Sequence, residues 1–309
     1  MRQPTLTRQL SSVRVAVIDV GANTLRLLVA TRDDEGRVEA IREDRRQLGL
    51  GEELERSGGT IGEEKLEAAA AVARMHMRRA RQFGAVSIAV LVTSPGRQSS
   101  NADELVAALR DATGCVVRVL SADEEGSLAW LGAVAAAENL PETVAVCDVG
   151  GGSAQVVVGA AGQGPTWSRS IDIGSLRLTK RFFRHDPPAP FELAEASAEV
   201  ARSFADMTPP LPLAALATGG TARGLRRIVG SELGEAELAI ARRKLVKRPS
   251  RDIAKDFGVD RARARTLTAG AIILSEAQRR LTVPLITARG GLREGGALIL
   301  LDELAAASA

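Results

Sequence analysis

Two short stretches of the sequence carry the residues best suited to chemistry. "AVIDVGANTLRLLVA" (16–30) and "AVCDVGGGSAQVVVG" (145–159) each run from an apolar segment through an aspartate and a glycine-containing turn to a hydroxyl residue. Aligned without a gap at an offset of 145 − 16 = 129 residues, they match at Ala, Val, Asp, Val and Gly, and Thr24 falls opposite Ser153. Such an internal match indicates a duplicated strand-turn-strand device, rather than two unrelated hairpins.

Both turns are suited to holding an anion. Glycine tolerates positive φ and lets the backbone come close to a ligand, so a tight turn can direct several N–H groups into one concavity. Each hydroxyl adds a further donor. We therefore predict two phosphate-binding hairpins, formed by Gly21, Asn23 and Thr24 in the first stretch and by Gly150, Gly151, Gly152 and Ser153 in the second.

An aspartate precedes each turn, and it would be repelled by a bound phosphate unless a cation lay between them. Mg²⁺ prefers hard oxygen ligands and can bridge carboxylate and phosphoryl oxygens. Asp19 and Asp148 are therefore candidate ligands for Mg²⁺ or for its bound water. A second interpretation stays open for Asp19, whose side chain could instead cap the turn.

A third glycine-rich turn lies in "ATGGTARGLRR" (217–227), where an apolar strand leads into a helical pattern. Gly219, Gly220 and Thr221 would place backbone N–H groups and the positive end of a helix dipole at one point. Alone, this pattern is an ordinary helix start. Together with the two hairpins, it favours a ligand that carries several phosphate groups.

Strands and helices alternate around these turns, which predicts α/β domains with mixed sheets. In the first half we expect strands at 13–20, 25–30, 36–44, 85–93 and 115–120, with helices at 62–84, from Asn101 to about Gly114, and from Ser121. Asn101 with Glu104, and Ser121 with Glu124, are predicted capping pairs. The same order then restarts, with strands at 143–150, 154–159, 164–174 and 213–220, a basic helix from Ser175, a Pro-rich connection at 185–196, and further helices to the end.

Composition limits the class of protein and its compartment. The chain has 309 residues, 45% apolar and 26% charged, which is typical of a soluble protein long enough for two domains. No apolar run approaches the roughly 20 residues that cross a bilayer, and the N-terminal segment lacks the apolar core of a secretory signal. Cys115 and Cys147 lie in apolar runs and are expected to be buried thiols, which fits a reducing cytoplasm.

Charge and aromatic content limit the partners. The net charge is only +3, but basic residues cluster at 176–185 and 241–251. Such runs are either solvated faces or attractors of a polyanion. Aromatic residues make up 3% of the chain, which leaves little material for stacking bases, so we expect no nucleic-acid partner and no membrane partner.

The three motifs in this order resemble the superfamily of actin, heat-shock ATPases and sugar kinases. Over nearly its full length, the chain more closely resembles the exopolyphosphatase and guanosine pentaphosphate phosphohydrolase (Ppx/GppA) family in its short form. The stretches that carry the resemblance are "DVGANTLRLLVA", "LVTSPGRQSSN" (91–101), "LSADEEGSLAWLG" (120–132), "DVGGGSAQ", "DIGSLRLTK" (172–180), "ATGGTARGL", "LTAGAIIL" (267–274) and "GGLREGGAL" (290–298).

The resemblance implies two ribonuclease H-like (actin-like) domains at 1–125 and 126–309, with a cleft lined by the hairpins and a final helix that packs back on the first domain. It also implies Mg²⁺ or Mn²⁺ as cofactor and a homodimer. By position, Glu125 would activate the attacking water and Arg97 would face the transferred phosphoryl group. The residues themselves support Glu125, because Glu124 is already assigned to the cap and Glu125 lies about 100° further round the helix.

The sequence departs from the family pattern at the hairpins. The family's second hairpin usually reads DxGGGSTE, whereas here Ala154 replaces the threonine and Gln155 replaces the glutamate that helps to bind metal. Ala22 likewise replaces a serine in the first hairpin. Gln155 keeps a carbonyl oxygen but loses the charge, so we expect a weak metal ligand at this position.

Three functions follow as expectations. The first is hydrolysis of inorganic polyphosphate at its terminal phosphate, and the second is hydrolysis of guanosine pentaphosphate. A third, of a different class, is a catalytically weak sensor that binds polyphosphate or a nucleotide, which the loss of charge at Gln155 favours. An ATP-dependent kinase or filament protein is less compatible with the paired glutamates at 124–125.

Overall fold

The computed structural model describes residues 13–308, so nearly all of the N-terminal segment that was predicted to lack a secretory signal lies outside the described residues. The chain divides into two units, the first formed by 1–136 together with 292–309 and the second by 137–291. Among residues 13–308, no helix is both long and apolar enough to cross a bilayer.

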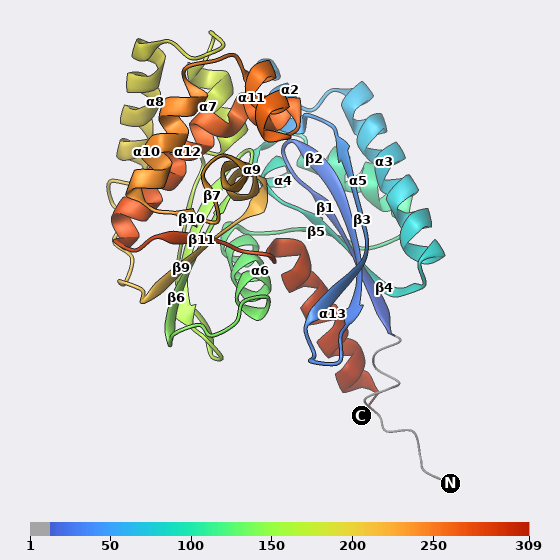
Figure 1. Ribbon diagram of the computed structural model, residues 1–309. Helices are drawn as coiled ribbons and strands as arrows, with labels where there is room; N and C mark the ends of the chain where they lie inside the picture. Colours follow the sequence, from blue (N-terminus) through green and yellow to red (C-terminus); the bar gives the residue numbers. More distant parts are fainter. Residues whose placement is uncertain (1–12, 309) are drawn as a thin grey trace. The chain divides into compact units, whose positions relative to one another are not determined.

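Unit 1 contains one five-stranded mixed sheet in the order β3-β2-β1-β4-β5 (Figure 1). β1 pairs antiparallel with β2 and parallel with β4. The elements are β1 (Arg14–Val20), β2 (Thr24–Arg32), β3 (Val38–Gln47), α2 (Leu50–Ser57), α3 (Glu63–Gln82), β4 (Ala85–Val92), α4 (Ser94–Gln98), α5 (Ala102–Thr113), β5 (Val117–Val119), α6 (Ala122–Ala135) and α13 (Leu292–Ala307).

Both faces of the unit 1 sheet are covered, because the strands are apolar on both sides. Ala16, Ile18 and Val20 of β1 join a core with α3 and α5, whereas Val15 and Val17 join a second core with α6 and α13. This follows from the two-residue period of a strand. Figure 1 shows α3 and α5 on one side of these strands and α13 on the other.

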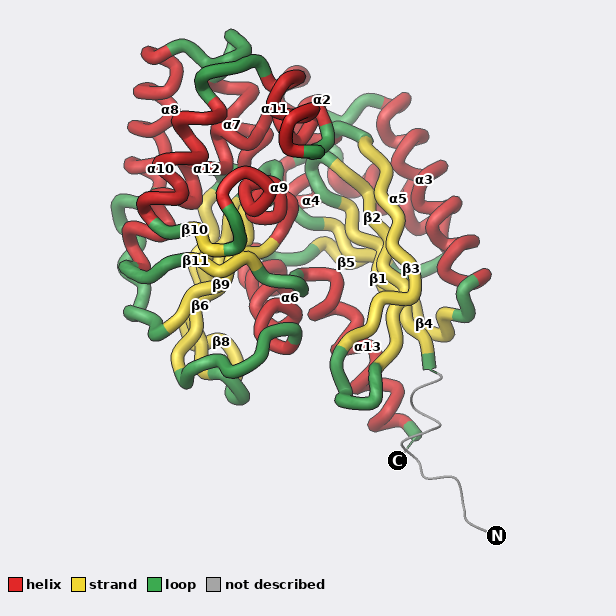
Figure 2. Tube along the Cα trace, in the orientation of Figure 1, coloured by secondary structure: helices red, strands yellow, loops and turns green. Residues whose placement is uncertain are grey.

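Unit 2 repeats this plan with a six-stranded mixed sheet in the order β10-β11-β9-β6-β7-β8. Its helices gather beside the sheet (Figure 2), and α12 is the long buried helix among them. The elements are β6 (Thr143–Val149), β7 (Ala154–Ala160), β8 (Gly164–Ile171), α7 (Ser175–Phe182), α8 (Pro190–Ser203), β9 (Ala214–Thr218), α9 (Gly219–Val229), β10 (Glu232–Leu233), α10 (Glu235–Leu245), α11 (Ser250–Phe257), α12 (Arg261–Leu281) and β11 (Leu285–Thr287).

The predicted mixed-sheet α/β architecture is confirmed, and the differences lie in short elements. β10 and β11 were expected to be helix or connection, and they are too short for any periodicity to reveal them. α8 begins inside the predicted Pro-rich connection, with Pro190 at its first position, where the missing N–H costs nothing.

Of the two predicted capping pairs, one is confirmed and one is wrong. Ser121 and Glu124 form a reciprocal capping box at the start of α6. Asn101 precedes α5 but makes no side-chain cap. Its amide instead bonds both backbone groups of Ile61, at 2.9 Å each, and donates to Glu104 at 3.0 Å. The long-range pairing with Ile61 therefore replaces the local cap.

His76 on α3 is a buried titratable group in unit 1. The residue has 0% exposure, Nε2 lies 3.5 Å from the carbonyl oxygen of Leu25, and Nδ1 has no hydrogen-bond partner in the described part of the chain. Burial lowers the pKa of His76 below its usual 6.5, although Leu25 and Asp44 act in the opposite direction.

We expect the free energy of unfolding to fall as pH drops below about 6.5, by at most about 1.4 kcal/mol per pH unit from this residue. In that window the unfolded chain takes up a proton that folded His76 does not. His76→Met should flatten the dependence, measured by urea unfolding at several pH values. The other histidine, His185, lies in the connection between α7 and α8 and contacts the buried Glu192 at 2.9 Å, so it is kept unchanged in both proteins. Equal slopes for wild type and His76→Met would contradict the account.

Candidate phosphate-binding and hydrolytic residues

The second hairpin, between β6 and β7, closes as a two-residue turn. The N–H of Gly150 donates to the carbonyl oxygen of Ser153 at 3.0 Å, so Gly151 and Gly152 form the tip. The Gly150 N–H therefore serves the turn itself. This N–H group was predicted to bind an anion, but its hydrogen bond lies within the turn.

The first turn of α7 holds the tip of this hairpin. The N–H of Ser175 donates to the carbonyl oxygen of Gly150 at 2.9 Å, and its hydroxyl donates to the same oxygen at 3.1 Å. The N–H groups of Leu176 and Arg177 both donate to Gly151 at 3.0 Å. The first N–H groups of a helix have no intrahelical partners, so the hairpin carbonyl oxygens complete the hydrogen bonding of α7, and α7 completes theirs.

This contact also sets the direction of the turn amides. Because a trans peptide is planar, a carbonyl fixed on the α7 side sends the next N–H to the opposite side. The N–H groups of Gly151 and Gly152 therefore both point away from α7, as an anion nest requires. Gly174 makes the approach possible, since a β-carbon there would overlap the backbone of Gly151 and Gly152.

The first hairpin, between β1 and β2, uses the same device. The N–H of Gly21 donates to the carbonyl oxygen of Thr24 at 3.0 Å, which again uses a predicted donor internally. The carbonyl oxygens of Ala22 and Asn23 accept N–H bonds of 2.6 to 3.1 Å from residues 48–51, at the start of α2. The duplication therefore extends from the hairpin to the helix that follows the third strand.

The third predicted turn is the start of α9. Gly219 has φ +82°, and Thr218 provides no side-chain cap because its hydroxyl donates to Gly290 at 2.7 Å. The Thr221 hydroxyl donates to the carbonyl oxygen of Val149 at 2.9 Å and so ties α9 to β6. The first-turn N–H groups of α9 have no side-chain cap, and an anion is the natural partner for such groups.

Two charged side chains lie against this helix start. Asp148 at the end of β6 would collide with a β-carbon on Gly219, and the Arg263 guanidinium on α12 would collide with one on Gly220. Sequence reasoning missed Arg263, because "RARAR" (261–265) has no local signature beyond charge. A side chain at either glycine would displace one of these charged groups from the start of α9, which is a steric reason for glycine at both positions.

Asp19 in unit 1 has a different environment from Asp148. It lies opposite Arg26 in the β1–β2 register, and Arg26 Nε donates to Thr24 Oγ1 at 3.1 Å. Burial raises the pKa of Asp19, and Glu294 adds to this, while Arg26 and Arg293 lower it. Two guanidinium groups therefore already act on the carboxylate that was predicted to hold a cation.

Arg293, which lies in the family-specific stretch at 290–298, has a structural role in unit 1. It is buried, and its shortest ion pair is with Glu43 on β3 at 2.8 Å, whereas Glu294 lies at 3.7 Å. A 3.5 Å hydrogen bond to the carbonyl oxygen of Leu27 adds to this. Arg293 thus ties the start of α13 to β2 and β3.

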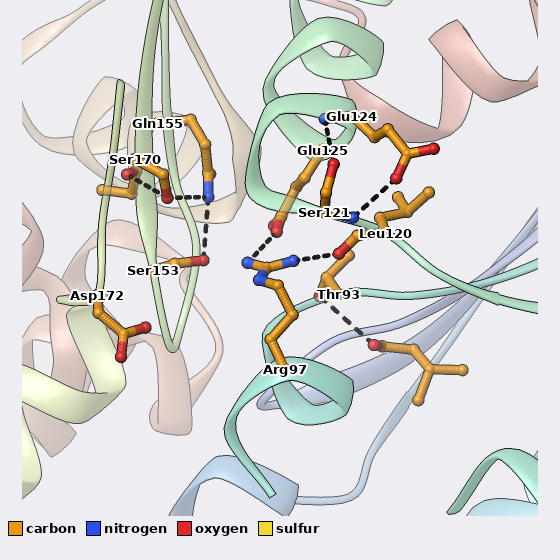
Figure 3. A network of polar contacts seen from close by, with 12 residues as sticks. Thr93, Arg97, Leu120, Ser121, Glu124, Glu125, Ser153, Gln155, Ser170 and Asp172 are labelled. Carbon is orange, nitrogen blue, oxygen red and sulfur yellow. Dashed lines mark hydrogen bonds and ion pairs between the residues drawn. The ribbon is translucent and has the colours of Figure 1, made fainter. Parts of the chain in front are cut away.

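Glu125 and Arg97, both in unit 1, are brought together (Figure 3). Arg97 Nη2 lies 2.6 Å from Glu125 Oε2, and Nη1 donates to the carbonyl oxygen of Leu120 at 2.8 Å. The Glu125 side chain is 8% exposed. Gly96 lets α4 approach closely, because a β-carbon there would crowd Val119. The carboxylate is therefore fixed in position and desolvated, with a cation against one of its oxygens.

Gln155 lies beside the second hairpin in unit 2 and is 1% exposed. Its Nε2 donates to Ser153 Oγ and to Ser170 Oγ, each at 3.1 Å (Figure 3). Its Oε1 is buried and has no hydrogen-bond partner among the described residues. An unsatisfied buried acceptor costs about 1–3 kcal/mol, so a ligand or water that supplies a donor would be stabilised here.

The donor set limits how a divalent cation could be held. Within residues 13–308, no group of three or more His, Cys, Asp or Glu side chains could hold a metal ion. Mg²⁺ commonly needs only one or two carboxylates, with water and substrate phosphate completing its shell. Asp148 with the unpartnered Gln155 oxygen fits an ion shared with a bound phosphate, and does not build a cage from protein alone.

Two actin-like α/β units, each with a glycine-containing hairpin between its first two strands, define the class of protein. The chain matches the Ppx/GppA phosphatase family over residues 28–304, and it belongs to that family. It is thus a phosphatase, as its sequence motifs predicted.

Individual relatives are distant but cover nearly the whole chain. Exopolyphosphatase 1 of Mycobacterium tuberculosis is 27% identical over 313 residues, covering 94% of this chain and 89% of the relative. An uncharacterised protein of Streptomyces coelicolor is 28% identical, covering 84% and 82%. The crystal structure of the Aquifex aeolicus family member has a TM-score of 0.79 and 26% identity, covering 96% and 99%.

Proposed function

We propose that this phosphatase releases the terminal orthophosphate of inorganic polyphosphate, with guanosine pentaphosphate as the alternative substrate. The main support is the buried Glu125 carboxylate, which Arg97 holds at 2.6 Å. A fixed carboxylate is the group that a hydrolase needs to take a proton from water. The exopolyphosphatase from M. tuberculosis supports the substrate class.

In the proposed reaction, a water oxygen bonds to the terminal phosphorus while Glu125 accepts a proton from that water. The bond from this phosphorus to the bridging oxygen breaks, and the chain leaves one phosphate shorter. Within unit 1, Arg97 donates to the phosphoryl oxygens, whose charge is dispersed in the transition state. The amides of Gly151 and Gly152, the start of α9, and the side chains of Asn23, Thr24 and Ser153 are separately proposed as phosphate-binding groups.

A divalent cation is part of the proposal. Asp148 would hold Mg²⁺ or Mn²⁺ together with the phosphate, and Asp19 is the second candidate carboxylate. When bound, the ion neutralises phosphoryl charge. Everything else in the proposed reaction is carried by the protein side chains and amides named above.

Orthophosphate release from long-chain polyphosphate and from guanosine pentaphosphate, measured separately with Mg²⁺, tests this function. We expect a higher kcat/KM with polyphosphate. Efficient release from the nucleotide alone would transfer the function to the alternative substrate. Binding of both without release from either would make the protein a sensor, the alternative that the uncharged Gln155 supports.

The preference for polyphosphate has support from the basic run at 241–251. Arg243 and Lys247 are exposed, and within the described residues no ion pair is found for either. Lys244 differs, because its Nζ donates to the carbonyl oxygen of Ile228 at 3.2 Å and lies over Phe257. A long polyanion could therefore contact Arg243 and Lys247 outside the catalytic residues.

The double change Arg243→Glu with Lys247→Glu should raise KM for long-chain polyphosphate by roughly 3- to 10-fold at low salt, because charge reversal repels the chain. KM for tripolyphosphate should change little. The matched control is Arg74→Glu with Arg78→Glu, two exposed arginines on α3. If KM rose equally for long-chain polyphosphate and tripolyphosphate, or rose equally in the control variant, a long chain would not contact Arg243 and Lys247.

We also propose a cytoplasmic homodimer that has no nucleic-acid or membrane partner. Sedimentation of the purified protein tests the oligomeric state.

A further inference from the structure

We propose that Gln155 makes the second hairpin a site that binds the terminal phosphate of an oligophosphate without a divalent cation. This inference rests on the proposed function, since it concerns the same ligand. It goes further by separating phosphate binding, which would need no metal, from hydrolysis, which would use one. The main observation is that the side-chain amide of Gln155 is buried and uncharged, and that it donates hydrogen bonds beside the turn where a bound phosphate would bring negative charge.

The orientation of the amide follows from its partners. The Ser170 hydroxyl donates its hydrogen to the carbonyl oxygen of Ala154, at 3.5 Å. The Ser170 Oγ can therefore only accept a hydrogen bond from the Gln155 side chain. This places Nε2, rather than Oε1, toward the hydroxyls, in agreement with the two 3.1 Å bonds. The amide is thus anchored at one end by two serines.

The consequence for Ser153 is a change of role. Its hydroxyl accepts from Gln155, so its own proton has to be donated to another acceptor. Ser153 ends the glycine turn whose Gly151 and Gly152 amides point away from α7. A phosphoryl oxygen at this turn would receive donors from the backbone and from Ser153. A carboxylate at position 155 would do the reverse, since it would accept the serine proton and repel the anion.

The remaining charges of unit 2 favour the same ligand. Asp148 lies against Gly219 at the start of α9, where the helix dipole is positive, and the Arg263 guanidinium lies against the next residue, Gly220. Asp172 is already paired with Arg177 at 2.9 Å. The hairpin therefore lacks the excess negative charge that would make a cation necessary for a phosphate to approach.

Gln155 Oε1 completes the arrangement. It is buried without a partner in the described residues, and a carbonyl oxygen can accept a hydrogen bond from a water molecule. A water that accompanies the bound phosphate can donate to it. Gln155 is on this account a positioning residue, which acts on the ligand through Ser153 and through water.

The test is calorimetric binding of tripolyphosphate to the full-length protein, once in EDTA and once in Mg²⁺. We expect the wild-type dissociation constants in the two conditions to agree within about threefold. In Gln155→Glu, binding in EDTA should weaken at least tenfold, and Mg²⁺ should restore it. Gln163→Glu is the matched control, because Gln163 is exposed in the turn between β7 and β8 and the substitution adds the same charge to the same unit.

The possible results distinguish failure of this inference from failure of the proposed function. Wild-type binding that needs Mg²⁺, or Gln155→Glu binding that is unaffected in EDTA, would overturn the inference even if hydrolysis is normal. Metal-independent binding without any hydrolysis would leave the inference standing and overturn the proposed function instead. Circular dichroism of Gln155→Glu separates loss of binding from loss of fold, and restored binding in Mg²⁺ provides the same assurance.

Discussion

Glu125→Gln is expected to lower kcat for phosphate release from polyphosphate by about 10²- to 10⁴-fold, while the dissociation constant for tripolyphosphate changes only a few-fold. Glutamine preserves the size of the side chain and a carbonyl oxygen near Arg97, but it cannot accept the proton of the attacking water. The measurement is steady-state orthophosphate release at saturating polyphosphate.

The adjacent residue provides the control. Glu124 accepts the N–H of Ser121 and pairs with Arg118 at 2.9 Å, so it belongs to the cap of α6. Because glutamine also completes a capping box, Glu124→Gln should keep activity within about twofold and change stability by less than about 1 kcal/mol. If Glu125→Gln retained a tenth or more of the wild-type kcat, the base would have to be sought elsewhere.

Gly295→Ala is expected to destabilise the protein by about 2–4 kcal/mol, despite the higher helix propensity of alanine. Gly295 lies on α13 where it meets α6, and a β-carbon there would overlap the backbone carbonyl of Leu128. Backbone cannot move aside as a side chain tip can, so the two helices would have to separate. Chemical denaturation measures the change.

The neighbouring glycine offers a matched comparison in the same turn of the same helix. A β-carbon on Gly296 would meet only side-chain methyl groups, of Val17 at 3.2 Å and of Leu91 at 3.4 Å. Gly296→Ala should therefore change the free energy of unfolding by no more than about 1 kcal/mol. If the two variants were equally stable, close helix approach at Gly295 would not explain the paired glycines of "LREGG".

The sequence could predict those parts of the molecule that have a local signature. The repeated aspartate-turn-hydroxyl pattern located both hairpins, and the capping box fixed the start of α6. The first two inferences needed only the strand period, the helix period and the chemistry of caps. Glu125 was implied by the family resemblance, and the capping role of Glu124 supported that choice.

The remaining features depend on tertiary contacts between distant residues. Arg263 reaches Gly220 from a helix some forty residues later in the chain, and nothing in "RARAR" distinguishes it from a solvated arginine. Asn101 forgoes its cap because Ile61, forty residues earlier, offers both backbone groups. The internal use of the Gly21 and Gly150 N–H groups likewise follows from turn closure, which a glycine count does not specify.

The hydrogen bonds from α2 and α7 to the hairpin tips define how much chain is needed to make a phosphate site. A peptide that contained only β6, the glycine turn and β7 would lack the N–H groups of residues 175–177, so its turn amides would not be held in one direction. The smallest segment that could be moved to another protein with the proposed phosphate site intact therefore runs through the third strand into the following helix, about 143 to 182 in unit 2. A duplication that copied only the hairpin would, on the same reasoning, have left its turn amides without a fixed direction.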